Sequence, residues 1–121
     1  MKTYLTFLLI TILYISINSC DTGYKDEFSN YSIVLKEVTP ITSPTSDNTP
    51  NYTFSSSESG TISYGGSCSS STNSAIAGNN TITLNTLFDG TYTDCKIIVS
   101  NVMSDSGDNI TSSLSISPFT V

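Results

Sequence analysis

The sequence predicts an all-β protein whose main part is an antiparallel β-sandwich of about seven short strands. Short runs of alternating apolar and polar residues recur along the chain, and a period of two is typical of half-buried strands. Turn signals rich in Gly, Asn, Asp and Ser separate these runs every 8 to 12 residues or so. No stretch after residue 20 combines a helical period with helix caps.

The first segment in chain order is predicted to be a signal peptide over residues 1–19. Lys2 supplies the positive charge, and Tyr4 to Ile17 forms an apolar stretch that is shorter than the roughly 20 residues that a membrane-spanning helix needs. The small residue Ser19 completes a pattern typical of secretory signal peptides.

Cys20 directly follows this stretch and is the predicted lipid attachment site. Ile17-Asn18-Ser19-Cys20 resembles the lipobox of bacterial lipoproteins, with Asn18 as a departure, since serine, alanine or threonine is commoner there. The resemblance implies a protein anchored in the bacterial cell envelope through two or more acyl chains. An ordinary secreted protein cut nearby and an uncleaved anchor are the alternatives.

Residues 20–30 are polar and lack periodicity, so we expect a flexible tether between the lipid and the domain. Asp21 resembles a signal that retains lipoproteins in the inner membrane. Lys25-Asp26-Glu27 resembles the acidic tags that send others to the cell surface. Because these hints conflict, the expected location is the cell envelope, facing either the periplasm or the outside.

The predicted sandwich covers residues 31–121. Three prolines make residues 40–50 a loop or an edge strand. The strands are expected at Tyr31 to Thr39, Asn51 to Ser56, Gly60 to Tyr64, Thr81 to Leu87 and Cys95 to Ser100, and in the closing segment 110–121. Turns are expected at Ser59-Gly60, Gly65-Gly66, Gly78-Asn79-Asn80, Asp89-Gly90 and Ser106 to Asn109.

The three cysteines have a simple interpretation. If Cys20 carries lipid, Cys68 and Cys95 remain as a disulfide pair in an oxidising compartment. Cys95 shares one strand face with Ile97 and Val99, which predicts that this cysteine lies in the core. A two-cysteine metal site is the alternative, but it lacks further sulfur or imidazole ligands.

Composition limits the function classes. The chain carries ten carboxylates against four cationic residues and has a formal charge of −6, which argues against nucleic acid as a partner. It contains no histidine and no tryptophan, so the commonest general base and metal ligand are missing. We therefore expect neither an enzyme nor a cofactor.

Two acidic groups have alternative interpretations. Asp105, Asp108 and Asn109, in the loop 101–109, could offer oxygen ligands to calcium, although their spacing matches no EF-hand and an ordinary acidic turn explains them. Asp89 and Asp94 could be read as the paired carboxylates of a glycosidase. A turn residue and a solvated side chain are the simpler interpretation.

Five tyrosines could form a sugar- or peptide-binding surface, but we expect most of them in core or edge packing. They are Tyr24, Tyr31, Tyr52, Tyr64 and Tyr92. Asp89-Gly90-Thr91-Tyr92 resembles a tyrosine corner, in which the hydroxyl bonds back to the backbone, although Tyr92 stands three residues before Cys95 where the pattern has two.

Several runs resemble bacterial immunoglobulin-like (Ig-like) domains of cell-surface proteins. They are Asn48 to Ser55, Gly60 to Tyr64, Gly65 to Cys68, Asn80 to Leu84, Leu87 to Tyr92 and the closing strand to Val121. The resemblance covers roughly residues 38–121 and implies an Ig-like sandwich. Its penultimate hairpin, Asn101 to Asn109, is longer than the family's usual one.

These expectations together describe a lipid-anchored Ig-like module of the cell envelope with a structural or adhesive role. Its partners would be the membrane, through the lipid, and a protein or glycan. The alternative is a small periplasmic or surface module that binds glycan or calcium. One sandwich fold hosts many roles, so the sequence leaves the partner open.

Overall fold

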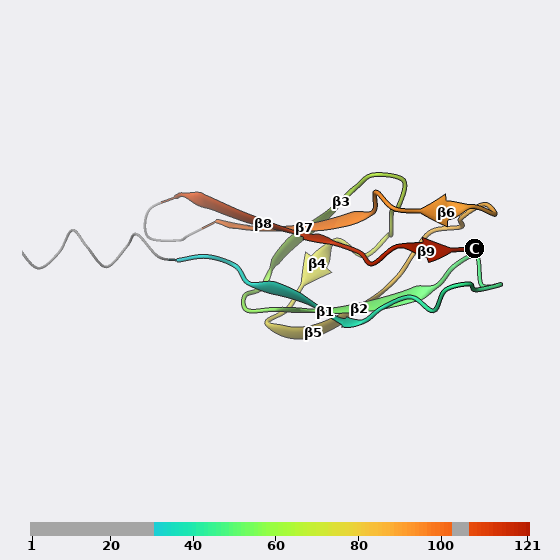
Figure 1. Ribbon diagram of the computed structural model, residues 1–121. Helices are drawn as coiled ribbons and strands as arrows, with labels where there is room; N and C mark the ends of the chain where they lie inside the picture. The colour runs from blue at the N-terminus through green and yellow to red at the C-terminus, as the bar shows by residue number, and fades with distance from the viewer. Residues whose placement is uncertain (1–30, 103–106) are drawn as a thin grey trace, which may run out of the picture. The chain divides into compact units, whose positions relative to one another are not determined.

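The computed structural model describes residues 31–102 and 107–121 (Figure 1). The predicted signal peptide, the lipid site at Cys20 and the tether over residues 20–30 lie outside the described residues. The compact unit that contains the strands runs from Ser32 to Val121. In the described ranges, no helix is long and apolar enough to cross a membrane.

Nine strands form in the described part of the chain, and none of its residues is helical. Their bounds are β1 Leu35–Thr39, β2 Asn51–Ser56, β3 Gly60–Gly65, β4 Ser74–Ala75, β5 Gly78–Thr83, β6 Thr91–Tyr92, β7 Lys96–Val102, β8 Asn109–Ser115 and β9 Phe119–Thr120. All paired strands are antiparallel. The predicted all-β class and antiparallel pairing are confirmed.

Two larger sheets enclose the core in a sandwich-like arrangement (Figure 1). The first sheet has the strand order β1-β2-β5, and the second has the order β4-β3-β7-β8. A third, two-stranded sheet pairs β6 with β9 at the end of the unit where the C-terminal residue lies.

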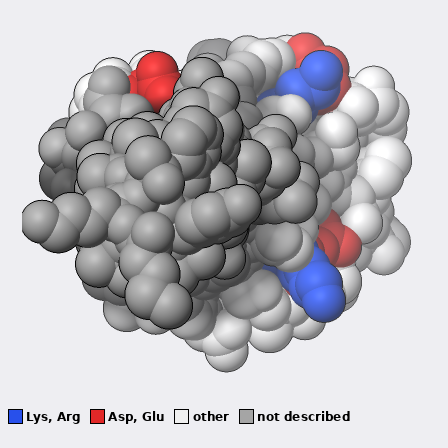
Figure 2. All heavy atoms as spheres, turned by 90° about the vertical axis from the view of Figure 1, so that its left-hand side faces the viewer, with Lys and Arg blue, Asp and Glu red and all other residues white. Residues whose placement is uncertain are grey.

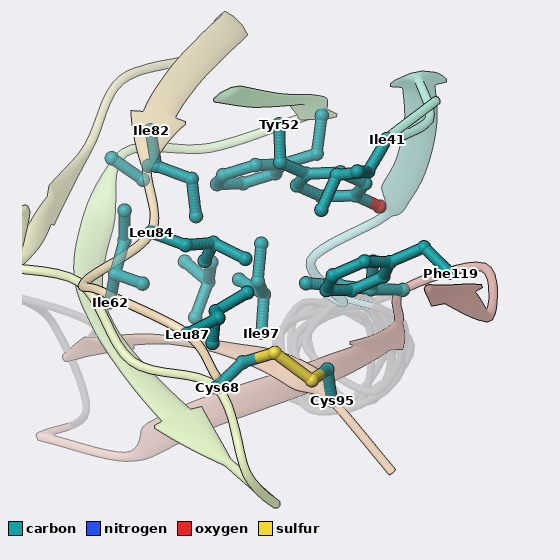
Figure 3. Packing of buried hydrophobic residues seen from close by; sticks show 14 of the residues in the cluster. Ile41, Tyr52, Ile62, Cys68, Ile82, Leu84, Leu87, Cys95, Ile97 and Phe119 are labelled. Atoms are coloured by element: carbon teal, nitrogen blue, oxygen red, sulfur yellow. A yellow bond between two sulfur atoms is a disulfide. The ribbon is translucent and has the colours of Figure 1, made fainter. Parts of the chain in front are cut away.

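The core follows the predicted alternation. Tyr52 and Phe54 of β2 are fully buried, and they face Ile97 and Val99, which are fully buried on β7 in the opposite sheet. Figure 3 shows Tyr52 and Ile97 in this packing, with the Cys68–Cys95 disulfide near Leu87. Because alternate side chains of a strand point to opposite faces, each strand buries one set and exposes the other.

The fourth predicted strand is displaced. Instead of Thr81 to Leu87, β5 covers Gly78–Thr83, so the expected turn at Gly78-Asn79-Asn80 is wrong. Asn80 is buried, and its side chain bonds to both the N–H (2.8 Å) and the C=O (2.9 Å) of Ile76. Asn80 thus lies in β5, and its side chain closes the turn between β4 and β5. Leu84 and Leu87 are buried in the core although they lie in the loop after β5.

Other differences concern strand ends and short strands. The first strand begins at Leu35 rather than Tyr31, and the closing segment divides into β8 and β9. The two-residue strands β4 and β6 were not predicted, because two residues are too few to show a period. The prolines of residues 40–50 lie in a loop, as expected, and the Ser43–Pro44 peptide bond is cis.

Candidate interaction surface

The outward face of the first sheet carries mainly hydroxyl and amide groups, with Lys36 of β1 as a charged member. On the first sheet, the Thr53 and Thr81 hydroxyls bond at 2.9 Å, and Thr83 donates to the Asn51 amide oxygen at 2.6 Å. In Figure 2, which views the unit from the left-hand side of Figure 1, acidic and basic side chains are scattered among uncharged ones.

Phe88 is the most exposed large apolar side chain in the described part of the chain, with 84% of its surface accessible. Its neighbour Leu87 is buried in the core, so the two adjacent side chains point in opposite directions. An exposed phenylalanine is a candidate contact residue, because aromatic side chains are enriched in protein interfaces.

The backbone of Phe88 is held on both sides by Tyr92 of β6. The Phe88 N–H donates to the Tyr92 hydroxyl at 3.1 Å, and that hydroxyl donates to the Phe88 carbonyl at 2.9 Å. The Tyr92 ring stacks on the buried ring of Phe119, with centroids 5.2 Å apart. The hydroxyl-to-backbone bond expected of a tyrosine corner is thus present.

Two further contacts fix the loop that carries Phe88. The Leu87 N–H donates to the Asn48 carbonyl at 2.8 Å, and Gly90 and Val121 exchange backbone hydrogen bonds at 3.1 and 3.0 Å. A backbone that is already restrained loses little further conformational entropy on binding. We call Phe88 with its supports Leu87, Gly90 and Tyr92 the Phe88 loop.

The disulfide between Cys68 and Cys95 reinforces the same half of the unit. Both cysteines are buried, with 3% and 2% of their surfaces accessible. Cys68 follows β3 and Cys95 precedes β7, and these two strands pair in one sheet, so the bridge closes the end of a ladder instead of joining the two sheets.

The residues before Cys68 add two contacts to the segment before Cys95. Gly66 has φ +76°, and a Cβ there would lie 2.0 Å from the Asp94 carbonyl oxygen, so only glycine fits. The Ser67 hydroxyl donates to the Asp94 carboxylate at 2.9 Å and lowers the pKa of that exposed group. Three successive residues, Gly66, Ser67 and Cys68, therefore lie against the segment that precedes β7.

Glu37 joins β1 to the segment after β8. Its carboxylate accepts the Ser117 hydroxyl (2.6 Å), the Ser117 N–H (3.0 Å) and the Tyr52 hydroxyl (3.0 Å). Burial raises the pKa of Glu37, but these three hydrogen bonds outweigh it and hold the pKa below the ordinary value. Burial and the neighbouring Glu37 raise the pKa of Tyr52.

The tyrosines do not gather into a binding surface in the described part of the chain. Tyr52 is fully buried, and Tyr64 and Tyr92 are partly buried against the core, as the packing interpretation predicts. The Tyr64 hydroxyl donates to the Thr72 carbonyl at 2.5 Å. Tyr31 is about half exposed, while Tyr24 lies outside the described residues.

The predicted acidic candidates form no metal cluster in the ranges described: no three His, Cys, Asp or Glu side chains come together there. Asp105 lies outside these ranges, so the calcium alternative for the loop 101–109 stays a hypothesis. Asp89 and Asp94 both lie on the surface, and the Asp94 carboxylate is used by Ser67.

Phe88 and Glu37 were not among the residues singled out from the sequence. The sequence does contain a local indication for Phe88. Leu87 and Phe88 are adjacent apolar residues directly before the turn at Asp89-Gly90, and in an extended segment adjacent side chains point in opposite directions. Glu37 has no such signal, because its partners Tyr52 and Ser117 are distant along the chain.

Comparisons of the chain with protein-family models, with curated proteins and with solved structures returned no match.

Proposed function

We propose that the chain is a lipid-anchored Ig-like module of the bacterial cell envelope that serves an adhesive or structural role through the Phe88 loop. One observation supports the adhesive role. Phe88 is 84% exposed, yet its backbone is fixed by two hydrogen bonds to Tyr92.

The order of the strands supports an Ig-like fold. Ig sheets contain strands A, B and E on one side and C, F and G on the other, with C′ added beside C in larger members. Here β1-β2-β5 corresponds to A-B-E, and β4-β3-β7-β8 corresponds to C′-C-F-G. The disulfide departs from that family, whose bridge joins strands B and F across the two sheets.

The arrangement of the strands places the Phe88 loop at one end of the unit. β1 enters the unit at the end opposite to β6 and β9, and Tyr92 of β6 holds Phe88 (Figure 1). The Phe88 loop therefore lies at the end of the unit opposite to the one where β1 begins.

The test is a comparison of Phe88→Ala with Ile76→Ala. Ile76 is 62% exposed and lies in the turn between β4 and β5, away from the Phe88 loop, which makes it a matched surface control. Immobilised wild-type and variant chains would be exposed to solubilised envelope from the source cells and to a glycan array.

We expect Phe88→Ala to reduce capture of the same ligand at least tenfold or so, because a hot-spot aromatic contributes about 2 kcal/mol or more. Ile76→Ala should capture that ligand normally, and both variants should keep the wild-type melting temperature. Equal loss in the two variants, or undiminished capture by Phe88→Ala, would refute the role of Phe88. A ligand found only on the glycan array would favour the glycan-binding alternative.

A further inference from the structure

The two larger sheets end in four edge strands, and three of these carry features that discourage pairing with another strand. β1 contains Lys36 and a register shift between Glu37 and Thr39. β4 has only two residues. On β5, the Ser70 hydroxyl occupies the Thr83 carbonyl at 2.6 Å. Charges, bulges, short length and covering loops are the usual ways of protecting an edge.

In the described part of the chain, β8 has no charge, proline or register shift and no loop bonded to its outer edge, although β1 of the other sheet lies near it. The seven residues of β8, Asn109–Ser115, pair continuously with β7. At its end, the Ser117 N–H is occupied by Glu37, and Pro118 follows. The unprotected edge therefore has defined limits.

The backbone groups that β8 presents at this edge follow from its pairing. The Ile116 N–H donates to the Cys95 carbonyl at 3.0 Å, so this pair is of the hydrogen-bonded type. Such pairs alternate along an antiparallel ladder, so the even-numbered residues of β8 bond to β7. Asn109, Thr111, Ser113 and Ser115 then direct their N–H and C=O groups away from the sheet.

The sequence of β8 reads similarly in both directions about Ser112. An antiparallel pair of two β8 strands centred there sets Ile110 opposite Leu114 of the second copy, and Thr111 opposite Ser113. Ile110 and Leu114 are both partly buried against the core, so the two sheets would join with matching inner faces. The N–H and C=O groups of Thr111 and Ser113, which have no backbone partner among the described residues, would exchange hydrogen bonds.

Charge does not oppose this pairing. In the register centred on Ser112, the two Asp108 side chains stand eight residues apart, about 27 Å at the usual rise of a strand. That distance exceeds the screening length of about 8 Å at physiological salt.

We propose that the free edge of β8 is a homodimer interface in which two copies pair antiparallel about Ser112. The pair joins the two four-stranded sheets into one continuous sheet of twice that width. This interface is independent of the lipid anchor and of the Phe88 loop.

The test is disulfide trapping of the full chain in intact cells. Ser112→Cys places a cysteine at the symmetry axis, in a non-hydrogen-bonded pair whose Cα atoms lie about 4.5 Å apart, within disulfide range. Ser63→Cys is the control, because Ser63 is exposed on β3, inside the same sheet. We expect at least fivefold or so more covalent dimer from Ser112→Cys than from Ser63→Cys after mild oxidation.

A second variant tests the edge itself. Ser113→Pro removes an N–H that faces away from β7, so the β7–β8 ladder keeps its hydrogen bonds. In the Ser112→Cys background it should abolish the covalent dimer while the thermal unfolding transition persists, and Ser113→Ala should leave the dimer intact. Equal trapping at Ser63 and Ser112, no trapping at Ser112, or a product heavier or lighter than two copies would each overturn the proposal.

Discussion

At the scale of single residues, Gly66 is the most constrained backbone position in the described chain. Its positive φ and its closeness to the Asp94 carbonyl both exclude a side chain. We predict that Gly66→Ala lowers the free energy of unfolding by about 3 kcal/mol, measured by urea denaturation. Gly90→Ala is the control, since a Cβ there meets nothing within 4 Å. Similar losses in both variants would show that Gly66 is not special.

Glu37 makes stability depend on pH. Because its folded-state pKa lies below the ordinary value of 4.5, the ionised form is favoured by folding. Its contribution is therefore present in full at pH values above the unfolded pKa and is lost as pH falls through the folded pKa.

We predict that Glu37→Gln is less stable than wild type at pH 7, by about 1 kcal/mol. The difference should shrink as pH falls below 4.5, the ordinary value, because wild type then loses its ionised carboxylate. Chemical denaturation of both proteins between pH 7 and pH 3 measures this. A difference that stays constant across that range would contradict the assignment.

At the scale of elements, the disulfide restrains the ends of β3 and β7. Its cysteines are 27 residues apart, and closing a loop of that length contributes about 3 to 4 kcal/mol in the chain-entropy model. We predict that the double variant Cys68→Ala/Cys95→Ala loses about that amount in urea denaturation. Reduction of wild type should produce a similar loss, and a much larger loss in the double variant alone would indicate that cavity formation dominates.

The alternation of residues located the longer strands well and the shorter elements poorly. Asn51 to Ser56 was predicted with its final bounds, because Tyr52 and Phe54 alternate with polar residues. The strand β5 was displaced from its predicted position because of Asn80. Asparagine favours turns, but here Asn80 lies in the strand and its side chain closes the preceding turn.

At the scale of the whole molecule, the anchor on Cys20 is tested by the intact mass of the mature protein from a membrane fraction. We predict a chain that begins at Cys20, carries acyl groups and is two hydrogens lighter than its reduced form, because Cys68 and Cys95 are paired. Cys20→Ser should release the protein from the membrane fraction. An unmodified mass for the wild-type chain would refute the anchor.

The sequence by itself determined the all-β class, the antiparallel pairing and most of the core, because side-chain period and turn chemistry act locally. It also singled out Cys68 and Cys95 as the pair that the structure joins. Only the tertiary structure decided the sheet orders and the contacts of Glu37. Those features depend on residues that meet across the fold, such as Glu37 with Ser117, and no local pattern encodes such a meeting.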